Sequence, residues 1–237
     1  MTTTPTVVLV HGAFADASSF AKLIPELLDS GIKVLAPAVP NRSLTGDAGY
    51  ISSVVRQING PVLLVGHSYG GAVITVSGTE ENVKGLVYLS GYALAEGESL
   101  GQLQGGFPDS ALAQALVYTK YPVAGAEDGT DVSVDIEKFP AVFAHDIDPG
   151  LARILAVSQR PLAGAAFAEP APAAAWKTKP SWGVVSSSDH TINPDVERFG
   201  YERAGAKVTE IDSSHLVMLS HPKQVADIIR EALAAIA

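Results

Sequence analysis

Short apolar runs alternate with segments of helical periodicity along most of the chain, and this rhythm predicts the fold. Six runs have the length and character of strands that are buried on both faces: residues 7–10, 34–36, 62–65, 86–89, 182–185 and 208–211. Apolar stripes at helical spacing cover residues 20–28, 51–58 and 225–236. Because such strands are joined by right-handed crossovers, we expect an α/β fold with a mostly parallel sheet of about six strands, flanked by helices.

One long stretch, residues 92–179, lacks this rhythm and carries several Gly and Pro residues. Its helical patches are rich in Ala and Leu and cover residues 112–117 and 151–157. We therefore predict a core made of residues 1–91 and 180–237, with residues 92–179 inserted between the fourth and fifth strands as a cap subdomain.

Composition narrows the class of protein. The chain has 237 residues, which suits one domain with an insertion, and its 47% hydrophobic and 17% charged residues are typical of a compact folded chain. The formal net charge is −9, and an acidic surface repels phosphate backbones and anionic lipids. We therefore expect neither nucleic acid nor membranes as partners.

Two absences narrow the chemistry and the location. The chain has no cysteine, which excludes disulfides and thiolate catalysis. Residues 1–12 lack the basic segment of a secretory signal, and no apolar stretch approaches the length of a membrane span. We therefore expect a cytoplasmic protein.

A candidate nucleophile follows the third predicted strand. Residues 62–65 lead directly into Gly66-x-Ser68-x-Gly70, and an apolar helical segment follows. A sharp turn between a buried strand and a helix needs glycines, because its strained backbone leaves no room for a Cβ. Ser68 would then project its hydroxyl at the carboxyl edge of the sheet, beside the positive end of a helix. The alternative is an ordinary glycine-rich turn.

A serine hydroxyl needs a base to take its proton, and the base needs a carboxylate that fixes its tautomer. Among six histidines, His215 lies in a loop after the last predicted strand, where it can reach Ser68. Asp189 directly follows the fifth strand and is the expected acid. Asp212 competes with it, but its place close to His215 in sequence favours local turn or capping work. Residues 89–92, where some related enzymes carry the acid, contain no carboxylate.

The loop after the first strand and the residue after the nucleophile are expected to supply the oxyanion hole. A tetrahedral intermediate needs two N–H donors, and we expect them from Ala13 and Tyr69, with Phe14 as the alternative to Ala13. Phe14, His11 and Tyr118 are the expected pocket residues, Tyr118 as one of several aromatic residues in the cap. His11 is also expected to hold its loop through hydrogen bonds.

Together these motifs resemble the small α/β-hydrolases of the esterase and methylesterase type, which include plant methylesterases, their hydroxynitrile lyase relatives and bacterial counterparts. The residues that carry the resemblance are Val10-His11-Gly12-Ala13, Gly66-His67-Ser68-Tyr69-Gly70-Gly71, Ser188-Asp189, Ser214-His215 and Leu219-Ser220-His221-Pro222. The resemblance implies the α/β-hydrolase fold with a cap over Ser68. It also implies hydrolysis of carboxylic esters through an acyl-enzyme, with neither cofactor nor metal.

Three positions depart from the other branches of that superfamily. The lyase branch usually has threonine where Gly12 stands and lysine where Leu216 stands, which argues against cyanohydrin cleavage. The dehalogenase and epoxide hydrolase branches use an aspartate nucleophile, which Ser68 replaces.

Few basic residues lie near these motifs, so we expect the substrate to be a small, neutral, partly apolar ester. A neutral lactone or amide would fit nearly as well. The alternatives are C–C bond hydrolysis, a lyase reaction, perhydrolysis or cofactor-independent oxygenation on the same fold, or a receptor that kept the hydrolase scaffold. Whether the protein forms a homodimer is left open.

Overall fold

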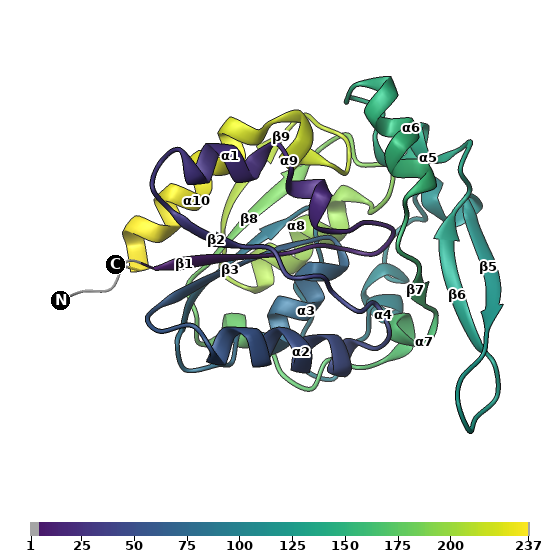
Figure 1. Ribbon diagram of the computed structural model, residues 1–237, viewed down its shortest axis with the longest axis horizontal. Coiled ribbons are helices and arrows are strands. Elements are labelled where there is room, and N and C mark those ends of the chain that lie inside the picture. Colours follow the sequence, from purple (N-terminus) through teal and green to yellow (C-terminus); the bar gives the residue numbers. More distant parts are fainter. Residues whose placement is uncertain (1–4, 237) are drawn as a thin grey trace.

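The computed structural model describes residues 5–236, and one parallel sheet runs through its centre (Figure 1). The six strands of this sheet follow the order β2-β1-β3-β4-β8-β9, and every neighbouring pair is parallel. Their bounds are β1 (Thr6–Val10), β2 (Lys33–Leu35), β3 (Val62–His67), β4 (Val83–Leu89), β8 (Ser181–Ser186) and β9 (Lys207–Ile211). The predicted six-stranded parallel sheet is thus confirmed.

The burial of these strands explains why the sequence predicts them. Every residue of β1, β3 and β8 is buried, because helices cover both faces of the sheet. The edge strands β2 and β9 are partly exposed. Parallel strands also end at one common edge, so the loops that follow β1, β3, β4, β8 and β9 meet at the carboxyl side of the sheet.

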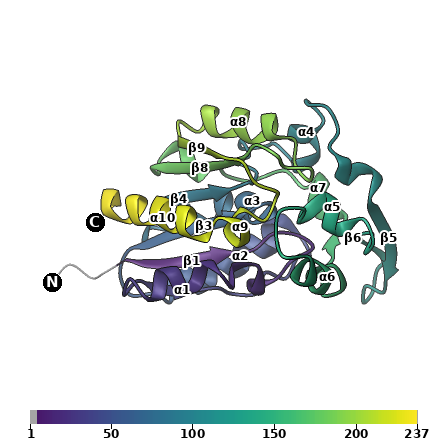
Figure 2. The same cartoon turned by 90° about the horizontal axis from the view of Figure 1, so that it is seen from above.

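Helices form the two outer layers (Figures 1 and 2). The helices of the core are η1 (Ala17–Phe20), α1 (Leu23–Leu28), α2 (Leu44–Arg56), α3 (Tyr69–Ser77), α8 (Pro194–Arg203), α9 (Val217–Ser220) and α10 (Pro222–Ile236). On one face α1 packs against α10. On the other, α2 packs against α3, while Tyr88 of β4 bonds to Thr75 of α3 and lies against Tyr201 of α8.

The first helical stripe is divided in two. The sequence places Pro25 near the middle of a helix over residues 20–28, but α1 begins only at Leu23, after the separate turn η1. Pro25 therefore lies in the first turn of α1. That turn tolerates proline because its N–H groups have no partner within the helix.

The insertion, residues 92–179, leaves the sheet after β4 and returns at β8. Its elements are α4 (Leu100–Gln104), η2 (Ala111–Gln114), β5 (Leu116–Tyr121), β6 (Gly129–Val134), α5 (Phe139–Phe143), α6 (Pro149–Val157), β7 (Leu162–Ala163), α7 (Ala165–Ala168) and η3 (Ala175–Lys177). The three strands form an antiparallel sheet of order β5-β6-β7, which stands at the right of Figure 1.

One prediction about the insertion is correct and another is wrong. Residues 151–157 form part of α6, as their pattern indicates. Residues 112–117 are not one helical patch, because η2 ends at Gln114 and β5 begins at Leu116. Four of the six residues of β5 are exposed, so the strand lacks the apolar alternation that marks a half-buried strand.

Hydrogen bonds tie the insertion to the loops at the carboxyl edge. The amide of Phe14, after β1, donates to the carbonyl of Arg160 at 2.9 Å. The amide of Ser214, after β9, donates to the carboxylate of Asp146 at 2.8 Å. The insertion therefore contacts the same edge of the sheet at which the predicted catalytic residues gather. None of the helices within residues 5–236 has the length and apolar character needed to cross a bilayer.

Candidate active site

Ser68 occupies a strained turn between β3 and α3. Its φ is 55° and its ψ is −123°, a conformation that residues with a Cβ rarely adopt. Glycines on either side allow the bend: a Cβ on Gly66 would overlap the carbonyl oxygen of Gly70, and a Cβ on Gly70 would overlap that of Val10. The Gly66-x-Ser68-x-Gly70 pattern therefore reflects close backbone approach.

Hydrogen bonds hold the strained backbone of Ser68 in place. Its amide donates to the carbonyl of Leu89 at 3.1 Å, and its carbonyl accepts from the amides of Gly71 and Tyr92 at 2.9 and 3.3 Å. Gly12 lies directly opposite, since a Cβ there would be 2.7 Å from the Cβ of Ser68 and 3.2 Å from its Oγ. The hydroxyl thus lies between the loop after β1 and the end of β4.

His215 and Asp189 meet in the buried interior, although 26 residues separate them. Nδ1 of His215 lies 2.5 Å from Oδ2 of Asp189, and neither side chain has any exposed surface. The other oxygen, Oδ1, accepts from the amides of Thr191 and Ile192 at 2.6 and 3.1 Å. These donors fix the orientation of the carboxyl group toward the imidazole.

The second imidazole nitrogen of His215 is left unpaired. Nε2 is buried and has no hydrogen-bond partner within residues 5–236. Phe143 touches the ring edge-on with 4.7 Å between centroids, and His67 lies 4.6 Å away. With Nδ1 donating to Asp189, Nε2 carries a lone pair and can accept a proton. The structure brings His215 and Asp189 into direct contact, but it does not pair Nε2 with the hydroxyl of Ser68.

Asp212, the competing carboxylate, takes part in a different interaction. It is exposed and accepts a hydrogen bond from the hydroxyl of Ser188 at 2.6 Å. This bond joins the loops after β8 and β9 at the surface, and it leaves Asp189 as the carboxylate that contacts His215.

The two histidines inside the glycine motifs brace loops. His11 accepts from the amide of Val39 through Nε2 at 2.8 Å, so its Nδ1 carries the proton and donates to the carbonyl of Gly12 at 2.9 Å. His67 donates through Nε2 to the carbonyl of His215 at 2.8 Å. Burial lowers the pKa of both imidazoles, so both stay neutral at neutral pH.

Two backbone amides near Ser68 are free to serve as an oxyanion hole. Among the described residues, neither the amide of Ala13 nor that of Tyr69 has a hydrogen-bond partner. The amide of Phe14 is already bonded to Arg160, so Ala13 suits the role better than the alternative donor. The side chain of Tyr69 points elsewhere, and its hydroxyl donates to Asp47 at 2.8 Å.

The pair of Tyr69 and Asp47 is buried, with 1% of each residue exposed. Burial, followed by the neighbouring carboxylate of Asp47, raises the pKa of the Tyr69 hydroxyl, and burial also raises the pKa of Asp47. The sequence analysis did not identify Asp47. It anchors the first turn of α3, immediately beyond Ser68, to α2.

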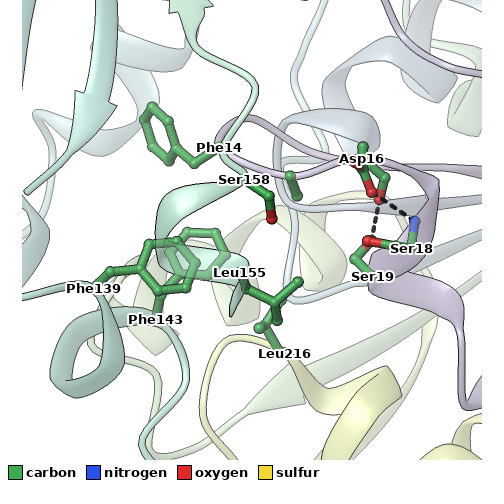
Figure 3. A pocket seen from close by; sticks show the side chains of 10 residues that line it. Phe14, Asp16, Ser18, Ser19, Phe139, Phe143, Leu155, Ser158 and Leu216 are labelled. Carbon is green, nitrogen blue, oxygen red and sulfur yellow. Dashed lines mark hydrogen bonds between the residues drawn. The ribbon is translucent and has the colours of Figure 1, made fainter. Parts of the chain in front are cut away.

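A small cavity lies between the insertion and the core; neither Ser68 nor His215 lines it, but Phe143, which contacts the imidazole of His215, does. Figure 3 shows it between the rings of Phe14, Phe139 and Phe143 and the segment that carries Asp16, Ser18 and Ser19. The complete lining is Phe14, Ala15, Asp16, Ser18, Ser19, Phe139, Phe143, Leu155, Ser158 and Leu216. Phe143 connects the cavity with His215. Its ring packs edge-on against the ring of Phe14, with 6.2 Å between the centroids, and also contacts the imidazole of His215.

Of the three expected pocket residues, the structure brings only Phe14 to this cavity. Both ring nitrogens of His11 are bonded to backbone groups, those of Gly12 and Val39, and the residue is fully buried without lining the cavity. Tyr118 lies in β5 with 65% of its surface exposed, because that strand is the outer edge of the small sheet. The insertion contributes Phe139, Phe143, Leu155 and Ser158 to the lining instead, and no local sequence pattern assigns these four residues to a pocket.

No group of three or more His, Cys, Asp or Glu side chains within residues 5–236 could hold a metal ion. The arrangement offers an unpaired imidazole nitrogen fixed by a carboxylate, a strained serine, two free amides and a nearby cavity with both apolar and polar walls. These parts can support nucleophilic attack on a carbonyl carbon.

Comparison with known proteins places the chain in a family. Residues 7–228 match the model of the alpha/beta hydrolase family. A probable hydrolase, R7 of Phoma sp., is 25% identical over 97% of this chain and 98% of its own length. Polyneuridine aldehyde esterase superposes with a TM-score of 0.83 at 19% identity, covering 97% of this chain and 99% of that one. A pyrethroid hydrolase from Sphingobium faniae JZ-2 superposes with a TM-score of 0.78 at 20% identity, and the match covers 98% of both chains. The chain belongs to the alpha/beta hydrolase family.

Proposed function

We propose that the protein is a serine esterase that cleaves small, neutral, partly apolar carboxylic esters, with Ser68 as nucleophile, His215 as base and Asp189 as acid. The observation that carries the proposal is the buried imidazole of His215. Its Nδ1 is bonded to Asp189 at 2.5 Å, and its Nε2 is left without a partner. Among the buried polar atoms without a partner, Nε2 is the one on an imidazole whose other nitrogen is bonded to a carboxylate, and we assign it the transfer of a proton.

The reaction follows from this arrangement. Nε2 of His215 takes the proton of Ser68 as Oγ bonds to the ester carbonyl carbon. The amides of Ala13 and Tyr69 donate to the oxyanion of the tetrahedral intermediate. The C–O bond to the alcohol then breaks, the leaving oxygen takes the proton from Nε2, and an acyl group stays on Ser68. Water repeats the sequence on the acyl-enzyme, which releases the acid and restores Ser68.

The cavity supports the substrate class. Its walls are aromatic and aliphatic on one side and carry hydroxyl groups on the other, with no lysine or arginine in the lining. The carboxylate of Asp16 would repel an anionic acid. Two similar proteins, a polyneuridine aldehyde esterase and a pyrethroid hydrolase, are named for hydrolytic reactions, which supports a hydrolase.

Two experiments test the proposal. A fluorophosphonate probe should label Ser68, as located by peptide mass spectrometry, and Ser68→Ala should abolish the label. A series of p-nitrophenyl esters of increasing acyl length should be hydrolysed, whereas a matched series whose acyl chains end in a carboxylate should be poor substrates. Catalysis that survives in Ser68→Ala, or a preference for the charged series, would contradict the proposal.

A further inference from the structure

A second buried carboxyl group lies against Asp189. Glu197 is in α8 and has no exposed surface. Its Oε2 accepts from the amide of Ser186 at 3.1 Å, and its carboxyl group lies next to that of Asp189. The other oxygen, Oε1, has no N–H or O–H donor among the described residues. A hydrogen bond between two carboxyl groups requires a proton on one of them.

The donors around the two groups show where this proton resides. Asp189 accepts from three N–H groups, those of Thr191, Ile192 and His215. Glu197 accepts from one. Two carboxylates in contact in a buried site cannot both ionise, and the group with fewer donors keeps the proton. Burial, reinforced by the charge of Asp189, raises the pKa of Glu197 well above its ordinary value.

Most charged and titratable groups around Glu197 favour its protonated form, and Arg198 is the exception among the described residues. The titratable groups that face it are Asp189, after β8, Tyr92, after β4, and Tyr201, one turn further along α8. Burial raises the pKa of both tyrosines, which are therefore neutral. The positive charge of Arg198 lowers the pKa of Glu197, but burial and the charge of Asp189 outweigh it, and the guanidinium is already bonded to two surface carboxylates.

A hydroxyl network fixes the position of Glu197. Its backbone partner, Ser186, is also bonded through Oγ to the hydroxyls of Ser90, at 2.5 Å, and Ser213, at 2.9 Å. All of these residues are buried. The network joins the ends of β4 and β8 to the loop that carries His215, so it holds the Glu197 carboxyl group at a fixed point relative to the catalytic residues.

We infer that Glu197 is a positioning residue, a neutral carboxylic acid that donates a hydrogen bond to Asp189 and holds this carboxylate in line with Nδ1 of His215. The inference deepens the proposed function, since its effect on catalysis depends on the role assigned to His215. Its geometry does not depend on that role, so it can be tested separately.

Three variants separate positioning from packing. Glu197→Gln keeps the size of the side chain, an N–H donor for Asp189 and an acceptor for Ser186. Glu197→Leu removes all hydrogen bonding at similar volume. Glu202→Gln, at an exposed position on the same helix, is the matched control.

Kinetics and two spectra provide the readouts. We expect Glu197→Leu to lower kcat by about 10- to 100-fold with little change in KM, because one hydrogen bond in the chain to the base is lost, and Glu197→Gln to restore activity to within about threefold. The downfield proton resonance of His215 Nδ1–H should move in Glu197→Leu and stay in place in Glu202→Gln. The infrared carbonyl band of a buried carboxylic acid should be present in the wild type and absent from Glu197→Gln.

The outcomes distinguish a failure of the Glu197 inference from a failure of the esterase proposal. A Glu197→Leu variant with unchanged kcat and an unchanged His215 resonance overturns the inference. So does an infrared band that persists in Glu197→Gln, a readout that holds even where Glu197→Leu does not fold. Protein that shows the band and the resonance shift, but neither hydrolyses esters nor reacts with phosphonates, supports the placement of Glu197 and refutes the esterase proposal.

Discussion

The backbone strain at Ser68 should be measurable as a difference in stability between two variants that both lack the hydroxyl. Ser68→Ala keeps a Cβ at φ 55°, and Ser68→Gly removes it. Neither variant can act as a nucleophile, so activity does not enter the comparison. Because the amide and the carbonyl of Ser68 are bonded to Leu89, Gly71 and Tyr92, the backbone of the alanine variant cannot relax without breaking those bonds.

The expected magnitude follows from three contributions. Relief of a strained left-handed conformation is worth about 1–3 kcal/mol. Glycine loses about 0.4–1 kcal/mol through the greater freedom of the unfolded chain, and a missing buried methyl group costs about 0.8 kcal/mol more. Ala72→Gly, at a fully buried position in α3, incurs both penalties without relief of strain. The effect of alanine-to-glycine at position 68 should therefore be more favourable than at position 72 by about 1–3 kcal/mol.

Urea and thermal unfolding give the two differences. Ser68→Gly is compared with Ser68→Ala, and Ala72→Gly is compared with the wild type, which has alanine at position 72. For a domain of this size the contrast corresponds to a difference of about 2–12 °C in the change in Tm. Equal losses at positions 68 and 72 would show that the turn at Ser68 is not strained, and the argument from the Gly66-x-Ser68-x-Gly70 pattern would then fail.

Three further predictions concern the site. Asp189→Asn should lower kcat by about 10⁴-fold, while Asp212→Asn should leave it within about twofold in steady-state ester hydrolysis; the reverse pattern would make Asp212 the acid. Gly12→Ala places a Cβ 2.7 Å from that of Ser68, and the displacement should lower both kcat and the rate of phosphonate labelling by about 10²-fold while the circular dichroism spectrum is unchanged. Glu197→Gln should stabilise the protein increasingly as the pH rises. Because its pKa is raised in the fold, native Glu197 keeps a proton that the unfolded chain releases above a pKa of 4.5, so wild-type stability falls with rising pH until the folded-state pKa is reached. Urea unfolding between about pH 5 and 8 should show the difference between variant and wild type growing by up to about 1.4 kcal/mol per pH unit, and parallel curves would exclude a neutral Glu197.

The sheet could be predicted because its central strands are buried on both faces. A strand covered on both sides must be apolar at every position, and residues 7–10 and 62–65 stand out for that reason. Strand β5 could not be predicted in the same way. Most of its residues are exposed at the edge of a small sheet, so burial imposes no pattern, and η2 before it supplied a misleading helical signal.

The contact between His215 and Asp189 was within reach of the sequence because of strand order. The loops that carry them follow the adjacent parallel strands β8 and β9, so both side chains come to the same edge. The cavity was beyond reach. Its lining depends on how the insertion packs on the core, and a contact such as that of Phe143 with His215 is set by tertiary packing without a local pattern. The sequence alone therefore gives no reason to prefer Phe143 to Tyr118 as a pocket residue.

Glu197 left a signal that could have been read. It lies four residues before Tyr201 and one after Val196, on the face of α8 that the core buries, where a charged residue is unexpected. A carboxyl group on a buried helical face needs a partner or a proton. Because the helix begins soon after Asp189, that partner is close in sequence as well as in space.

The charge of the carboxyl pair explains why a neutral Glu197 suits the chemistry proposed for His215. One proton shared by Glu197 and Asp189 gives the pair a net charge of −1, which matches the single positive charge that the imidazole acquires in the transition state. If both groups were ionised, two negative charges would face each other in a buried site with no proton between them, which burial strongly disfavours. If Asp189 were the protonated member, nothing would hold the ring in the tautomer that leaves Nε2 free. The three N–H donors around Asp189 and the single donor at Glu197 place the negative charge where the imidazole can use it.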